Sequence, residues 1–194
     1  MYRVERWDEG VQEDHRALSS QVGALEAAIT IDVGPEDRRI VLSWIIRNLW
    51  AALELHLRKE REVLFAALEQ LLGSTAGALT LLKDQHKELQ AAHRRLAELL
   101  QITENTNWDG VRFAVEWLID LLDDHERKTN HLLLGVLEYS LKPKDLKALA
   151  EAFEQVARRA YEEEGWPKAW WERKPPIVVD DKTLKEDLCG KHLS

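Results

Sequence analysis

The chain has 194 residues, of which 45% are hydrophobic and 32% charged, and its formal net charge is −8. This length suits one domain with an additional element or tail, and the acidic balance argues against binding to nucleic acid or to an anionic membrane surface. The single cysteine, Cys189, excludes an intramolecular disulfide framework and a cysteine-based zinc cage. The first residues contain no apolar leader, and no run of about 18 apolar residues is present, so we expect a cytoplasmic protein that does not enter a membrane.

Two long segments with helical periodicity occupy the first third of the chain. In the first, apolar residues and one histidine recur at steps of three and four from Val11 to Ile29. The stretch "DVGPED" (32–37) ends this segment and places a proline where a new helix can begin. The second segment has the same period from Leu42 to Leu71 and ends at "GSTAG" (73–77).

Two further segments with this period follow. One extends from Leu79 to Leu100, and the other extends from Val111 to Val136 after the polar connection "TENTNWDG" (103–110). None of the four segments has the alternation of a strand. Four long amphipathic helices with short connections predict an all-α fold, an antiparallel up-down four-helix bundle formed by residues 1–140.

The remaining residues predict a short helix and a tail. A fifth helix is expected in 141–164, beginning near Pro143, where its apolar stripe would pack on the bundle or on a second copy of the chain. From Gly165 onward the composition changes to Trp and Pro without helical period, which predicts an extended tail over 165–194. A homodimer formed through the fifth helix or the tail is one arrangement that these features allow.

Histidines replace apolar residues on the buried stripes of all four long helices. Five of the seven histidines lie there, namely His15, His56, His86, His93 and His125. A single histidine on such a stripe is usually satisfied by a neighbouring polar group, but a cluster of buried imidazoles needs a common partner. A metal ion is such a partner, and this explanation is favoured over a metal-free helical bundle.

The spacing of His56 and Glu60 supports a metal site. They are four residues apart, one helical turn, so both side chains can reach one centre. Imidazole and carboxylate ligands suit Fe, Mn or Zn. Inward-facing ligands of these kinds form the di-iron and di-manganese sites of four-helix bundles.

This pattern of histidines and one glutamate on four helical stripes resembles the hemerythrin-like family, the HHE cation-binding domains. The motifs occur in the family's order as "EDHRAL" with His15, "HLRKE" with His56 and Glu60, "DQHKEL" with His86, and "DDHERKTNH" with His125. The likeness covers about residues 8–160. It implies that the metal is non-haem iron, in preference to Mn or Zn, and that two ions are bound in preference to one. It also implies that Glu60 bridges the ions, with His15 and His56 on one and His86 and His125 on the other.

The chain departs from the family pattern at three positions. Gln90 stands where well-known members have a second histidine, four residues after His86. Thr129 and Asn130 stand four and five residues after His125, where members have a second bridging carboxylate. Seven side chains are candidates for additional ligands or for hydrogen-bond partners of the ligands, with a structural or solvated role as the alternative for each: Gln12, Gln90, His93, Asp124, Thr129, Asn130 and His131.

The resemblance implies a protein that binds O2, or reacts with it or with NO or peroxide, by redox chemistry at the metal. Two other functions are consistent with the same residues. One is an enzyme, a non-haem iron oxygenase or peroxidase acting on a small substrate. The other is a sensor or interaction module, in which the metal stabilises the fold and the fifth helix and the tail contact a partner.

Overall fold

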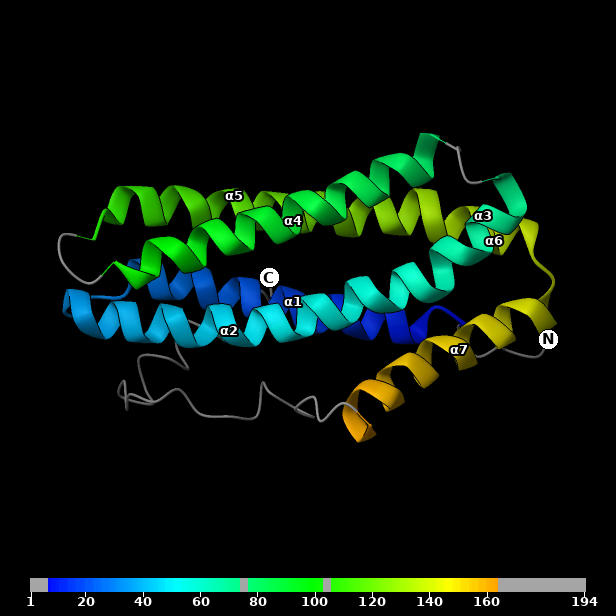
Figure 1. Ribbon diagram of the computed structural model, residues 1–194, viewed down its shortest axis with the longest axis horizontal. Helices are drawn as coiled ribbons and strands as arrows, with labels where there is room; N and C mark the ends of the chain where they lie inside the picture. Colours follow the sequence, from blue (N-terminus) through cyan, green and yellow to red (C-terminus); the bar gives the residue numbers. More distant parts are fainter. Residues whose placement is uncertain (1–6, 74–76, 103–105, 164–194) are drawn as a thin grey trace, which may run out of the picture.

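Figure 1 shows the computed structural model of the chain, which describes residues 7–73, 77–102 and 106–163. Every regular element in these three ranges is a helix. The expected all-α fold is therefore confirmed for this part of the chain, whereas the predicted tail over 165–194 lies outside it. In chain order the elements are α1 (Glu9–Thr30), α2 (Pro35–Lys59), η1 (Glu60–Phe65), α3 (Ala66–Leu72), α4 (Gly77–Gln101), α5 (Trp108–Lys128), η2 (Thr129–Leu134), α6 (Gly135–Ser140) and α7 (Pro143–Glu162).

The long helices α1, α2, α4 and α5 lie side by side along the long axis of the molecule (Figure 1). The most extensive contacts join α1 to α2 and α4 to α5, and further contacts join α2 to α4 and α1 to α5. Each long helix therefore packs on two others. A helical bundle of this kind has one shared interior, into which all four helices direct their apolar stripes.

The helix boundaries follow from local sequence. Pro35 occupies the first turn of α2, where its missing N–H is not needed, and the acidic Glu36 and Asp37 follow it. Before α5, the Asn107 side chain accepts a hydrogen bond from the Gly110 amide at 3.0 Å, which caps the helix. After α3, Gly73 has φ +85°, a conformation that favours glycine.

The apolar interior consists of two clusters with a polar layer between them. On every long helix, the apolar stripe passes from one cluster to the other at this layer. The change occurs at His15 on α1 and at Glu60 where α2 meets η1. It occurs at His86 on α4 and just after His125 where α5 meets η2. The four helices therefore bring their polar residues to the same level of the bundle.

Helix α7, which corresponds to the fifth helix expected from the sequence, packs against α1, α2 and η1. It begins with Pro143, and its apolar stripe includes Phe153 and Val156, each 2% exposed. Arg159 donates to Glu62 of η1 at 2.7 Å, which adds a polar contact at the edge of the same interface. This helix lies along the outer side of the bundle, beside α1 and α2 (Figure 1).

The helical stretch Pro35–Leu72 is long and apolar enough to cross a membrane by length and composition, with a mean hydropathy of 1.3 in its most apolar window. A buried core helix of a globular protein passes the same test. Of that window, 56% is buried inside the bundle, so packing against the other helices accounts for its apolar character.

Candidate metal centre

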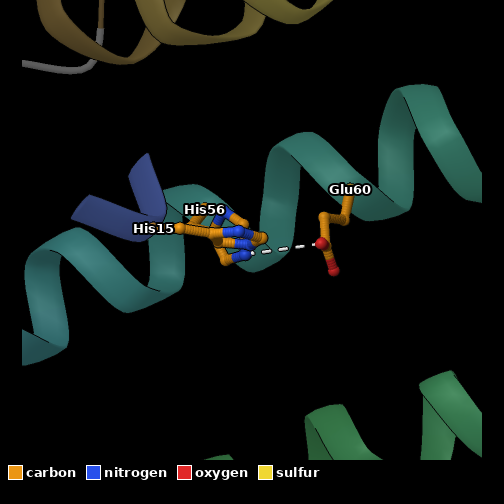
Figure 2. Close-up of side chains that lie close together, drawn as sticks. All are labelled: His15, His56 and Glu60. Carbon is orange, nitrogen blue, oxygen red and sulfur yellow. Dashed lines mark ion pairs between the residues drawn. The ribbon is translucent and has the colours of Figure 1, made fainter. Parts of the chain in front are cut away.

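Five of the predicted side chains meet in the polar layer. They come from α1, α2, η1, α4 and α5, and none is more than 4% exposed: His15, His56, Glu60, His86 and His125. They form two groups, His15 with His56 and Glu60, and Glu60 with His86 and His125, and in each group the ligand atoms lie within 4.8 Å of one another. Glu60 belongs to both groups. Figure 2 shows the first group, in which the imidazoles of His15 and His56 lie against each other and face the carboxylate of Glu60.

The Glu60 carboxylate lies between the two pairs of imidazoles. Its Oε1 atom is 3.4 Å from His56 Nε2, and its Oε2 atom is 2.9 Å from His86 Nε2 and 3.4 Å from His125 Nε2. Each carboxylate oxygen therefore faces a different group, which is the geometry that a bridging carboxylate needs.

Several imidazole nitrogens in the layer lack a hydrogen-bond partner among the described residues. Neither ring nitrogen of His15 has one, nor has Nδ1 of His86 or of His125. In addition, His56 Nε2 and His125 Nε2 face each other at 3.3 Å, where two N–H groups would repel. Buried polar atoms are normally paired, so this arrangement fits a positively charged partner shared by the nitrogens.

The surroundings of Glu60, His15 and His125 lower the pKa of each group and so favour the deprotonated form that binds a metal. Burial raises the pKa of Glu60, but the facing His125 and His56 imidazoles overcome this and hold that pKa well below its usual range. Burial lowers the pKa of His15 to about 3 and that of His125 to about 4, the latter against the attraction of Glu60. For His56, burial is outweighed by Glu60 and Asp14, which raise its pKa to about 9. A metal ion would displace the His56 proton when it binds.

Two short π-helical segments lie at the level of the cluster. η1 begins at Glu60, four residues after His56, and η2 begins at Thr129, four residues after His125. Single-turn π segments inside α-helices are rare and are frequent at functional sites. The spacing of four already places His56 with Glu60, and His125 with Thr129, on one helix face, and the π segments change the phase of the residues that follow.

Thr129 and Asn130 occupy the positions of the second carboxylate, and both take part in hydrogen bonds near the centre. Thr129 is fully buried, and its hydroxyl donates to Glu60 Oε1 at 3.0 Å. Asn130 accepts a hydrogen bond from the Gln12 side chain at 2.9 Å. Thr129 therefore touches the candidate bridging group, whereas Asn130 and Gln12 bind each other across the helices.

The other candidates named from the sequence lie outside the two groups. Gln90 donates to Glu54 at 3.1 Å. His93 is hydrogen-bonded to the Ile46 carbonyl at 3.2 Å and stacks on Trp50. Asp124 accepts from Gln85 and pairs with Arg127 and Lys128, and His131 is exposed, although it lies within η2.

Two residues that the sequence interpretation did not single out lie directly behind His56. Asp14 Oδ2 is 3.3 Å from His56 Nδ1, and Lys59 donates to both Asp14 oxygens at 2.8 and 2.9 Å. The available signal was their position, since each directly precedes a candidate ligand, His15 or Glu60. It was weak because charged neighbours are ordinary on the solvent face of a helix.

A buried cluster of histidines around one shared carboxylate, inside an all-helical bundle, defines a class of metal-binding helical domain. Residues 8–137 match the family model of the hemerythrin HHE cation binding domain. The chain belongs to this family, which confirms the resemblance seen in its sequence motifs. No curated protein and no solved structure matches the chain. Family and cluster together indicate a metal-binding domain, and the imidazole and carboxylate donors fit iron.

Proposed function

We propose that the chain is a non-haem di-iron protein that binds or reacts with O2 or a related small oxidant such as NO or peroxide. The observation that carries the proposal is the position of Glu60, whose two oxygens face separate groups of histidines. In this proposal the four long helices, α1, α2, α4 and α5, form the antiparallel up-down bundle expected from the sequence. Iron would supply reversible one-electron chemistry and open coordination positions.

Each residue of the cluster has a distinct role in this proposal. His15 and His56 would hold one ion, His86 and His125 would hold the other, and Glu60 would supply a carboxylate oxygen to each. Thr129 orients the Glu60 carboxylate by donating a hydrogen bond to its Oε1 atom. The Thr129 hydroxyl is neutral, so it does not supply a second bridging carboxylate. Leucines of the two apolar clusters exclude water above and below the polar layer.

The space beside the cluster favours a small ligand over an organic substrate. A cavity of about 10 Å³ lies between α1 and α5, and its lining includes His15, His125, Leu18 and Val22. This volume accommodates about one water-sized molecule. A cavity on this scale beside His15 and His125 supports binding of a small oxidant next to the cluster.

Optical spectroscopy of the iron-loaded protein tests the proposal. Anaerobic loading with Fe²⁺ followed by O2 should produce an absorption band in the near-ultraviolet or visible region. Loss of this band on removal of O2, and its recovery when O2 is added again, would support reversible binding. Irreversible oxidation coupled to consumption of a co-substrate would support the enzyme alternative. A protein that takes up no iron, or whose iron gives no spectral response to O2, NO or peroxide, would contradict the proposal.

A further inference from the structure

A partly buried ion pair, Asp14–Lys59, lies on the outer side of His56, away from Glu60. The imidazole has one nitrogen on each side: Nε2 is 3.4 Å from Glu60 Oε1, and Nδ1 is 3.3 Å from Asp14 Oδ2. Lys59 contacts both oxygens of Asp14. His56 is thus held between two carboxylates, one in the cluster and one behind it.

Helix α7 covers the Lys59 side of this ion pair. Lys59 is only 5% exposed, although lysine is almost never buried without a partner. Its Nζ atom lies 4.7 Å from the centre of the Phe153 ring of α7, a cation–π distance. Phe153 lies beyond residue 137, the end of the family match. A helix outside the matched domain therefore covers the groups that contact His56.

The other three imidazoles of the cluster have no comparable carboxylate partner in the described part of the chain. Nδ1 of His86 and Nδ1 of His125 make no hydrogen bond there, and His86 packs instead on the Phe65 ring at 4.8 Å. His15 Nδ1 is 3.8 Å from Glu126 Oε1, too far for a hydrogen bond. The two candidate metal positions therefore differ in what surrounds them.

A carboxylate behind a ligating imidazole acts through ring orientation and tautomer. When Nδ1–H donates to Asp14, the Nε2 lone pair is directed into the cluster, and the ring becomes a better donor. Removing such a partner typically lowers metal affinity by about 10- to 100-fold. Lys59 balances the charge of Asp14, so that the partly buried carboxylate can stay fixed.

We propose that the Asp14–Lys59 pair, covered by α7, positions His56 and makes the His15–His56–Glu60 position the tighter of the two metal positions. Asp14 and Lys59 are positioning residues in this inference, because they act through His56. The inference rests on the proposed two-metal centre and adds an order to its filling. The full chain should therefore take up Fe²⁺ in two separable steps.

Anaerobic titration with Fe²⁺ against a competing chelator tests this order. The main variant is Asp14→Leu/Lys59→Met, which replaces the ion pair by apolar groups, because such replacements are often neutral for folding whereas an unpaired buried lysine is not. We expect the tighter step to weaken by about 10- to 100-fold and the weaker step to change by less than about threefold. Lys59→Arg, which keeps the pair, should preserve both steps.

Two further measurements separate positioning from folding. Glu36→Gln removes an exposed ion pair with Arg39 at the other end of α2 and should leave both affinities unchanged. In the metal-free protein, NMR of ¹⁵N-labelled histidine should detect a His56 Nδ1–H protected from exchange, and the double variant should lose this signal. The second readout needs no iron.

The outcomes distinguish this inference from the proposed function. Wild-type protein that binds no Fe²⁺ would overturn both. Wild-type protein that binds two ions, together with a double variant whose two affinities are unaltered or equally reduced, would overturn the inference alone. Binding of two ions by the wild type in a single step with equal affinities would also refute it.

Discussion

Glu60 is the residue on which the two halves of the centre depend. It is fully buried, and its neighbours within 3.4 Å include His56, His86, His125 and the hydroxyl of Thr129. A buried carboxylate with several donors around it stays ionised, and its two oxygens can then serve two cations. The neutral hydroxyl of Thr129 leaves Glu60 as the carboxylate shared by both groups.

Replacing Glu60 by glutamine should remove most of the bound metal. The amide keeps the shape of the side chain but loses the negative charge that both groups share, and a neutral amide is a poor ligand for these cations. We therefore expect fewer than about 0.3 metal ions per chain by elemental analysis. Glu62→Gln on the same helical segment is the matched control, because Glu62 is exposed and pairs with Arg58 and Arg159. Equal metal content in the two variants would refute the assigned role of Glu60.

The Thr129 hydroxyl should stabilise the metal-free protein through Glu60. Thr129→Val keeps the volume and deletes the hydrogen bond to a charged group, so the free energy of unfolding should fall by about 1.5–3 kcal/mol. Chemical denaturation of the metal-free protein measures this difference. Thr129→Ser, which retains the hydroxyl, should lose much less. A valine variant as stable as the wild type would show that the hydrogen bond contributes nothing.

Among the residues, the cluster was predictable and its surroundings were not. His15, His56, His86 and His125 were detectable because each interrupts an apolar stripe at helical spacing, a pattern that sequence displays directly. The directions of Gln90 and Asp124 were not, because a polar residue at the edge of a stripe can turn inward or outward. Whether Asp14 and Lys59 would meet depended on how α1, α2 and α7 pack.

The π segments η1 and η2 are the feature of the helices that sequence periodicity missed. Residues 42–71 and 111–136 have a continuous helical period in the sequence, but the structure has a π turn in each, beginning at Glu60 and at Thr129. A π turn adds one residue to the turn, which a helical period averaged over thirty residues hides.

The N-terminus of α5 provides a test of local helix stability. The Asn107 side chain accepts from the Gly110 amide and satisfies one of the free donors of the first turn. Asn107→Ala should therefore lower the free energy of unfolding by about 1 kcal/mol, measured by denaturant titration. Asn107→Ser can form the same cap and should be close to the wild type. An alanine variant with undiminished stability would argue against the cap.

For the whole molecule, the polar layer divides the apolar interior at the level where all four long helices carry candidate ligands. Burial of unpaired imidazoles between the two apolar clusters is unfavourable without a cation. A metal ion that binds the folded chain and not the unfolded chain stabilises it by about 2.7 kcal/mol at a concentration 100 times its Kd. The bundle and its metal are therefore expected to be coupled thermodynamically.

The metal-free protein should be most stable near pH 6.5. His15 and His125 have folded-state pKa values of about 3 and about 4, so the unfolded chain, with values near 6.5, binds more protons below that pH and stability falls as the pH decreases. His56, whose folded pKa is about 9, binds its proton more tightly in the folded state, so its contribution is lost as the pH rises from 6.5 to 9.

Thermal unfolding of the metal-free protein between pH 4 and pH 9 measures this dependence. Substitution of His15 by glutamine should flatten the acid side of the profile, because one of the two depressed groups is removed. Substitution of the exposed His131 by glutamine is the matched control and should leave the profile unchanged. A wild-type profile without a maximum between pH 5.5 and 7.5 would contradict the assigned charges of the layer.

The number of iron ions per chain tests the central claim most directly. After anaerobic loading with Fe²⁺ and removal of excess metal, elemental analysis of the full chain should find about two ions, one for each histidine pair that shares Glu60. One ion per chain would contradict the bridging role of Glu60, and a content below about 0.3 would contradict an iron centre altogether, because imidazole and carboxylate donors of this kind are expected to retain iron.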